Sequence, residues 1–128
     1  MFKILIVEDS FLFRNLLKET LQSQFPAAEV IEAADGKEAL QKIDFSNPNL
    51  VFMDIELHGE NGLNLTRRIK AQYPHLVVIF LTSHDLQEYR DAAYQSGADY
   101  FLSKGTATKV DILALVDSIL SDRQSSPP

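Results

Sequence analysis

Four short apolar runs constrain the fold of this chain more than any other feature of its sequence. Each run has five residues or fewer, which is too short for a buried helix, and none alternates with polar residues. Uninterrupted apolar runs are typical of strands in a parallel sheet that is covered on both faces. A fifth segment, residues 28–33, alternates more, and we expect it to form an edge strand. The four runs are Ile4–Val7, Leu50–Met53, Val77–Leu81 and Tyr100–Leu102.

Segments with helical periodicity separate the predicted strands. Ser10, Asp35, Asn61 and Thr108 can each cap the start of a helix. The remaining helix, the fourth, is marked by Leu86, Tyr89, Ala92 and Ala93 and ends at Gly97. This alternation predicts an α/β fold, a doubly wound parallel sheet with helices on both faces. The side chains expected on the inner faces of the other four helices are Leu12, Leu16, Leu17, Leu21, Ala39, Leu40, Ile43, Leu65, Ile69, Tyr73, Ile112, Leu115, Val116 and Ile119.

The 128 residues fit one domain. We expect this domain to span residues 1–121, and residues 122–128, which lack an apolar anchor, to form a flexible tail or linker stub. No apolar run approaches the 18 or so residues that span a bilayer, and the N-terminus lacks a signal-peptide pattern. A chain without cysteine has no disulfide scaffold, thiolate zinc site or cysteine nucleophile. We therefore expect a cytoplasmic protein that does not contact a membrane.

Charge argues against one class of partner. Twelve basic and eighteen acidic residues give a net charge of −6, and no basic cluster is longer than Arg67–Arg68. Nucleic-acid binding requires a basic surface that displaces counterions from phosphates. We therefore expect no direct binding of nucleic acid by this chain.

Polar residues follow four of the predicted strands at the point where each strand ends. They are Glu8 and Asp9, Asp54, Thr82, and Lys104. Ligands of open α/β sheets bind outside the carboxyl ends of the strands, so these side chains are expected to meet. Crowded carboxylates favour either proton uptake or a bound hard cation, and Mg²⁺ suits carboxylates with a phosphate oxygen. The set fits phosphoryl transfer, with Asp54 attacking phosphorus while Mg²⁺ and Lys104 neutralise the phosphoryl oxygens.

Each of these residues also has an ordinary structural explanation. A strand must end in something polar, and Ser10 fits a helix cap better than a nucleophile. His58, His75 and His84 lack metal-ligand spacing and are expected in solvent. The coincidence at four strand ends is what favours a functional site.

The chain contains six short motifs, four of which include the polar residues at the strand ends. They are ILIVEDS at 4–10, DGKEAL at 35–40, VFMD at 51–54, NG at 61–62, LTS at 81–83 and GADYFLSK at 97–104. With these motifs the chain resembles the receiver domains of two-component response regulators, the CheY-like family, from Phe2 to about Leu120. The resemblance implies a flavodoxin-like, five-stranded parallel sheet in the order 2-1-3-4-5 with five helices.

The resemblance also implies a function for individual residues. Asp54 would accept a phosphoryl group from a sensor histidine kinase or a phosphotransfer protein, and the domain would catalyse this step and its own slow dephosphorylation. Thr82 and Lys104 would contact the phosphoryl oxygens. The Mg²⁺ ligands would be Asp9, Asp54 and the main-chain carbonyl of Glu56, with Glu8 acting through water.

A switch is implied as well. Phe101 falls at the switch aromatic position, and its inward rotation would follow the movement of Thr82. The change would reach an output protein or output domain through the face formed by the fourth helix, fifth strand and fifth helix, with homodimer formation on phosphorylation as one outcome.

Two residues depart from the family pattern. His58 and Gly105 stand where prolines are usual, and glycine leaves the loop after Lys104 more freedom.

Two other residues are expected to set the lifetime of the phosphorylated state. Glu56 and His84 each lie two positions beyond a site residue, so both are expected to flank the path of the attacking water.

Three other functions remain open. A pseudo-receiver would bind partners without phosphorylation, although the complete set of site residues argues against it. A flavodoxin-like cofactor binder needs a phosphate cradle after its first strand, whereas Glu8 and Asp9 would repel a flavin phosphate. An aspartyl phosphatase needs its nucleophile at the first strand and a cap over the substrate, for which the chain leaves little room.

Overall fold

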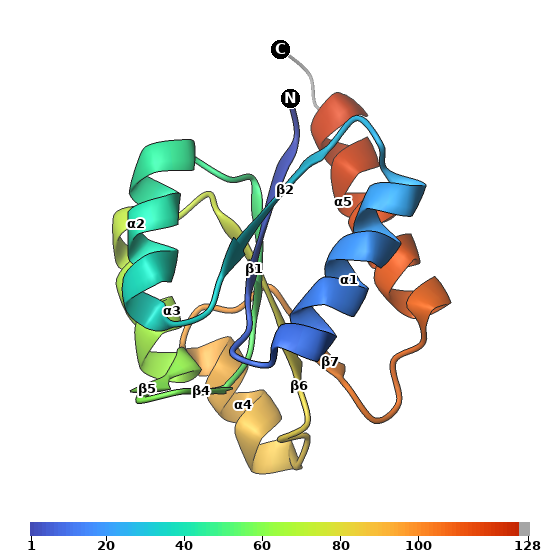
Figure 1. Ribbon diagram of the computed structural model, residues 1–128. Helices are drawn as coiled ribbons and strands as arrows, with labels where there is room; N and C mark the ends of the chain where they lie inside the picture. Colours follow the sequence, from blue (N-terminus) through green and yellow to red (C-terminus); the bar gives the residue numbers. More distant parts are fainter. Residues whose placement is uncertain (126–128) are drawn as a thin grey trace.

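A computed structural model describes residues 1–125 and shows a parallel sheet between two layers of helices (Figure 1). The sheet order β2-β1-β3-β6-β7 is the predicted doubly wound order, with the alternating strand β2 at one edge. All four pairings in this sheet are parallel. The fold-class prediction is confirmed. The strands are β1 Lys3–Val7, β2 Glu29–Ala33, β3 Leu50–Met53, β6 Val77–Thr82 and β7 Tyr100–Ser103.

The five helices within residues 1–125 divide between the two faces of the sheet. Helices α1 (Phe11–Gln24) and α5 (Lys109–Ser125) cover one face, and α2 (Gly36–Ser46), α3 (Gly62–Gln72) and α4 (Gln87–Gln95) cover the other (Figure 1). The last helix continues beyond position 121, so the first four residues of the expected tail, 122–125, are helical. Residues 126–128 of that tail lie outside the described residues. No helix within residues 1–125 is both long and apolar enough to cross a membrane.

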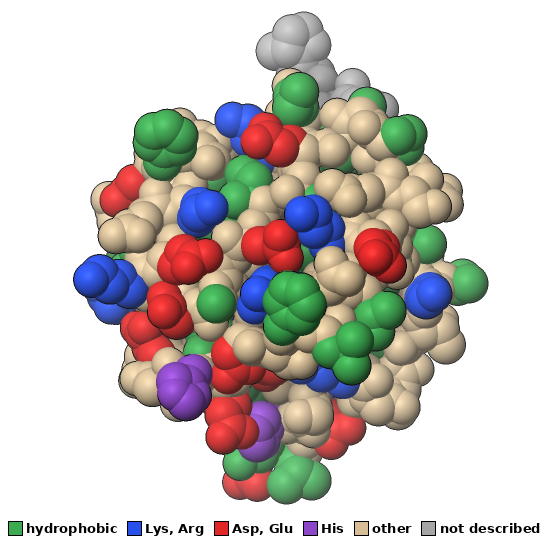
Figure 2. Space-filling model, viewed as in Figure 1, with side chains coloured by type: hydrophobic (Ala, Val, Ile, Leu, Met, Phe, Trp, Pro, Cys, Tyr) green, Lys and Arg blue, Asp and Glu red, His purple; other side chains and the backbone are tan. Residues whose placement is uncertain are grey.

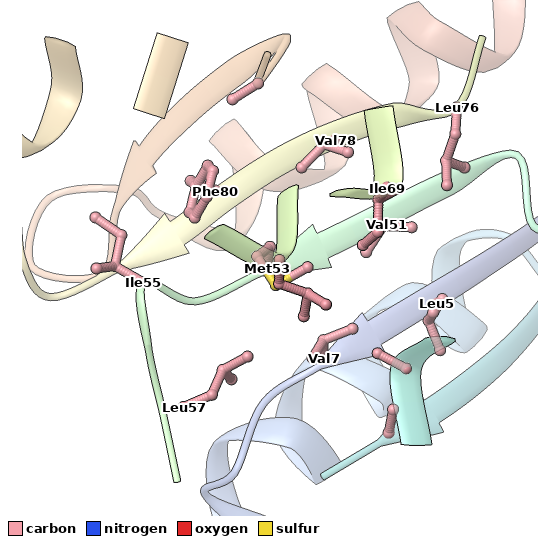
Figure 3. Close-up of a cluster of buried hydrophobic side chains, with 14 of the residues drawn as sticks. Leu5, Val7, Val51, Met53, Ile55, Leu57, Ile69, Leu76, Val78 and Phe80 are labelled. Atoms are coloured by element: carbon pink, nitrogen blue, oxygen red, sulfur yellow. The ribbon is translucent and has the colours of Figure 1, made fainter. Parts of the chain in front are cut away.

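Two clusters of buried side chains hold these layers together, one on each face. Neighbouring residues of β1 go to opposite clusters, with Leu5 and Val7 facing α2–α4 and Ile4 and Ile6 facing α1 and α5. Figure 3 shows the α2–α4 cluster, in which Met53 of β3 lies between Val7 of β1 and Phe80 of β6. Because both faces are covered, the central strands read as uninterrupted apolar runs.

The predicted helix caps are present. The side chains of Ser10, Asp35 and Asn61 accept hydrogen bonds from the first turns of α1, α2 and α3. Thr108 and Asp111 cap α5 reciprocally, each side chain accepting from the other's amide. Each bond satisfies an amide that has no partner within its helix. The start of α4 has no side-chain cap, and its cap residue, Leu86, is exposed.

One part of the core prediction is wrong. Leu12 and Leu16 of α1 were expected to face inward but are 69% and 50% exposed, whereas Leu17 and Leu21 are buried. The buried stripe advances in steps of four residues from the half-buried Phe13. Leu12 and Leu16 precede that stripe by one residue, about 100° around the helix, and lie on its flank.

A small hairpin after β3 was not predicted. Strands β4 (Glu56–Leu57) and β5 (Glu60–Asn61) pair antiparallel around a turn in which Gly59 has a φ of +74°. The side chain of Leu57 is buried and anchors the hairpin to the α2–α4 cluster. Two-residue strands are too short to produce a pattern in the sequence.

Gly62, which starts α3 directly after the hairpin, allows close backbone contact. Its amide donates to the carbonyl of Ile55 over 2.7 Å. A Cβ atom at this position would lie 1.9 Å from the carbonyl oxygen of Asp54. Only glycine fits here without moving the residues that follow β3.

We predict that Gly62→Ala destabilises the domain by about 2–4 kcal/mol, because the backbone of Asp54 must shift to admit the methyl group. Urea unfolding measures this change. The matched control is Gly105→Ala, whose Cβ would meet only the Ser103 Oγ, at 3.7 Å. Equal effects of the two substitutions would contradict the steric explanation.

The edge strand β2 is tied to α1 by ion pairs. Glu32 lies 3.2 Å from Arg14 Nε and 3.0 Å from Lys18 Nζ. Partial burial acts to raise the pKa of Glu32, but its bonds to Lys18 and Arg14 outweigh this, and its pKa is lowered. A carboxylate with a lowered pKa stabilises the fold above its unfolded pKa, and this contribution is lost as the pH falls through the folded value.

We therefore predict that Glu32→Gln lowers the free energy of unfolding at pH 7 by roughly 0.5–1 kcal/mol. The difference from wild type should shrink as the pH falls below 4.5, the ordinary pKa of a glutamate, and through the lowered pKa of Glu32. Urea titrations across this range test the prediction. A difference that stays constant down to pH 3 would show that the ion pairs do not stabilise β2.

Candidate functional site

The carboxyl ends of β1, β3, β6 and β7 surround a polar cavity of about 330 Å³. Acidic and histidine side chains gather near the lower end of the face shown in Figure 2, below the ends of the strands in Figure 1. The side chains predicted from the strand ends therefore meet at one edge of the sheet. The cavity is lined by Glu8, Asp9, Ser10, Asp54, Glu56, Leu57, His58, Gly59, Ser83, His84 and Lys104.

Lys104 connects the two buried carboxylates of the cavity. Its ammonium nitrogen lies 2.5 Å from Glu8 Oε1 and 2.9 Å from Asp54 Oδ2. Its main-chain amide donates to the carbonyl of Thr82 over 2.9 Å, which continues the pairing of β6 with β7. The lysine thus links the ends of β1, β3 and β6 to the end of its own strand, β7.

Burial and the contacts among Glu8, Asp54 and Lys104 together shift the pKa values of Glu8 and Lys104. Desolvation raises the pKa of Glu8 and exceeds the lowering by Lys104 and by the amide of Ser10. Burial alone would lower the pKa of Lys104, but its hydrogen bonds to Glu8 and Asp54 outweigh this and raise it. Lys104 therefore remains a cation in a site that is otherwise acidic.

Both oxygens of Asp54 have partners. Oδ1 accepts from the Thr82 hydroxyl over 2.6 Å and from the amide of Glu56 over 3.3 Å, while Oδ2 faces Lys104. The Asp54 and Thr82 side chains are buried, yet Asp54 lines the cavity. A carboxylate oriented in this way at the end of a central strand can act as a nucleophile towards a group that enters the cavity.

The loop after β1 is also held in place. The guanidinium of Arg14 donates to the main-chain carbonyl of Glu8 over 2.6 Å, and Glu8 Oε2 accepts from the amide of Ser10 over 3.0 Å. Asp9 lines the cavity from this loop, and its side chain is exposed. Sequence reasoning missed Arg14, for which the only signal was its position within the first helix.

Glu56 and His84 meet over the cavity. His84 Nε2 lies 2.6 Å from Glu56 Oε2, so the hairpin after β3 contacts the loop after β6. The ring of His84 lies against that of Tyr89, with 5.2 Å between centroids. Sequence reasoning placed both residues beside the site but did not predict that they bind each other.

Phe101 is buried at the middle of the outer strand β7. Its ring stacks with Phe80 at a centroid distance of 6.4 Å, and the guanidinium of Arg90 lies 4.6 Å from its centroid. The Phe101 ring is thus buried in a structure in which Thr82 contacts Asp54.

The oxygen atoms around the cavity suit a hard cation by their chemistry. Glu8, Asp9 and Asp54 supply carboxylates from two neighbouring loops, and Glu56 also lines the cavity. Within residues 1–125, no three acidic, histidine or cysteine side chains are arranged closely enough to hold a metal ion as they stand. Two of the three carboxylates are bound to Lys104 instead.

Comparison with known proteins identifies the family. The sequence profile of the response regulator receiver domain matches residues 4–117. The transcriptional activator protein ExaE of Pseudomonas putida is 37% identical over 92% of this chain and 55% of its own length. The chemotaxis protein CheY of Halobacterium salinarum is 35% identical over 80% of this chain and 83% of its own length.

The structural comparison agrees. A CheY-like receiver domain protein from Methanospirillum hungatei has a TM-score of 0.86 at 26% identity, covering 98% of this chain and 99% of its own. This chain spans about a third to a half of the first curated relatives that it matches. With the motifs, the fold and the polar strand ends in agreement, the chain belongs to the response regulator receiver domain family.

Proposed function

We propose that this domain accepts a phosphoryl group on Asp54 from a sensor histidine kinase or a phosphotransfer protein, and that phosphorylation changes its interactions with other proteins. The observation that carries the proposal is the environment of Asp54. One of its oxygens is bound by the Thr82 hydroxyl and the other by the Lys104 ammonium. Membership of the receiver family supports the same reaction.

The reaction needs little covalent chemistry from the protein. A carboxylate oxygen of Asp54 forms a bond to phosphorus as the bond between phosphorus and the donor's leaving atom breaks, and the leaving atom keeps the electron pair. Lys104 neutralises charge on the phosphoryl oxygens, and the Thr82 hydroxyl donates a hydrogen bond to one of them. Hydrolysis by water later returns the free carboxylate.

Magnesium is part of the proposal. A divalent cation at this site would neutralise the phosphoryl oxygens and reduce repulsion among the carboxylates. Asp9, Asp54 and the carbonyl of Glu56 would bind it, and Glu8 would act through water. Asp9 lies at the cavity without an interaction to Lys104, so its carboxylate is accessible to such an ion.

The signal would leave through the face formed by α4, β7 and α5. Thr82 and Phe101 are the proposed switch residues, because Thr82 contacts Asp54 while Phe101 packs under Arg90 of α4. The partner is an output protein, an output domain or a second phosphorylated copy of this chain. We place this activity in the cytoplasm, with no membrane or direct nucleic-acid contact by the domain itself.

Incubation with acetyl phosphate and Mg²⁺ tests the proposal. We predict one added phosphoryl group by intact-mass analysis in wild type and in the control Asp117→Asn, which changes an exposed carboxylate on α5. Asp54→Asn, and wild type with excess EDTA, should gain none. Stoichiometric phosphate on Asp54→Asn, or an unmodified wild type that also fails to bind beryllofluoride, would reject the proposed function.

The contact between Glu56 and His84 leads to a second prediction. The two side chains bridge the cavity beside Asp54, where an attacking water must approach phosphorus. We predict that replacing both with Ala changes the hydrolysis rate of the phosphorylated protein by at least several-fold. One hydrogen bond that differs in the transition state is worth roughly 1–2 kcal/mol, and each 1.36 kcal/mol is about tenfold in rate.

The half-life of the phosphorylated protein is the measurement, followed by loss of mass after removal of the donor. Mg²⁺ affinity should change much less, because the proposed metal contact of Glu56 is through its main chain. His75→Ala, which removes an exposed histidine distant from this cavity, is the control. A half-life within about twofold of wild type in the double variant would exclude both residues from this function.

A further inference from the structure

The ammonium of Lys104 has a third neighbour besides the two carboxylates. It lies 4.2 Å from the centroid of the Phe13 ring. A lysine ammonium has three N–H donors. Glu8 and Asp54 each accept a hydrogen bond from the ammonium, and the ring face covers part of its remaining surface. The Lys104 side chain is accordingly only 19% exposed.

Hydrogen bonds hold the main chain on both sides of Lys104. Ser103 is buried, and its hydroxyl donates to Asp85 Oδ2 over 2.7 Å and accepts from the amide of Gly105 over 3.2 Å. The amide of Ala107 donates to the carbonyl of Ser103 over 2.8 Å. Gly105 between these anchors brings no side chain to restrain the loop. The main chain fixes where the Lys104 side chain begins, and the position of the ammonium at the end of this flexible four-carbon side chain depends on contacts of the side chain itself.

Phe13 is well placed to supply such a contact. Its amide is bound by the N-cap Ser10, which fixes it in the first turn of α1. Its ring is half-buried and packs against the buried side chains between the sheet and helices α1 and α5. It also lines an apolar cavity of about 170 Å³ with Leu81, Ala107 and the lysine. The ring is thus held by the fold independently of Lys104.

We propose that Phe13 is a positioning residue for Lys104, holding its ammonium between Glu8 and Asp54 through the face of the aromatic ring. An ammonium over an aromatic face is attracted by the ring quadrupole, and this attraction is stronger where water is excluded. Phe13 carries no proton or charge that takes part in the reaction. Its effect reaches Asp54 only through Lys104.

The catalytic part of this inference rests on the proposed function. Phe13→Leu keeps an apolar side chain but removes the ring face, whereas Phe13→Tyr keeps the face. We expect the phosphorylation rate with acetyl phosphate to fall about three- to tenfold in Phe13→Leu and to return to within about twofold of wild type in Phe13→Tyr. The control is Phe45→Leu, an aromatic side chain that is 91% exposed on α2.

A double-mutant cycle tests the contact without any phosphoryl donor. Phe13→Leu is made in wild type and in Lys104→Met, and the unfolding equilibrium constant of each protein is measured in urea. A merely structural function for Phe13 predicts the same change in both backgrounds. If Phe13 positions Lys104, the change in the unfolding equilibrium constant caused by Phe13→Leu is at least about threefold larger when the lysine is present.

The outcomes separate the two proposals. Equal changes in both backgrounds, or a Phe13→Tyr variant as slow as Phe13→Leu, would overturn the inference about Phe13. Wild type that takes up no phosphate and no beryllofluoride would instead reject the proposed function, while the cycle would still decide whether Phe13 holds Lys104.

Discussion

The ion pairs of Lys104 allow two carboxylates to be buried side by side at the end of the sheet. Glu8 and Asp54 are both buried, and an unpaired buried carboxylate costs several kcal/mol. Because the ammonium binds both carboxylates, it holds the ends of β1, β3 and β7 in fixed positions relative to one another. Removing the lysine would leave the two negative charges facing each other. The geometry of the cavity therefore depends on this one side chain and on what holds it.

Much of this arrangement could be predicted from the sequence because it follows from the backbone. Strand ends at a common edge are a consequence of parallel topology, so the sequence alone predicts that Glu8, Asp54, Thr82 and Lys104 meet. The caps at Ser10, Asp35 and Asn61 were predictable for a similar reason, since an N-cap bond is local in sequence.

The features that were missed depend on side-chain direction or on very short elements. Leu12 and Leu16 are as apolar as Leu17 and Leu21, so the sequence of α1 offers two overlapping stripes. Packing against the sheet decides between them, and periodicity alone does not. The contact of Lys104 with Phe13 joins residues 91 positions apart, and no local pattern indicates it.

Charge explains why the proposed reaction requires more than Lys104. The cavity is lined by the carboxylates of Glu8, Asp9 and Asp54 and by the ammonium of Lys104, so it already has an excess of negative charge before any donor enters. A phosphoryl group adds a charge approaching −2 at neutral pH while removing only the single charge of the carboxylate that it modifies. The excess would then grow, in a space where water screens charges poorly. A divalent cation would offset this excess. Asp9 is exposed beside the buried Glu8 and Asp54, so it offers such a cation a carboxylate that is not bound to Lys104.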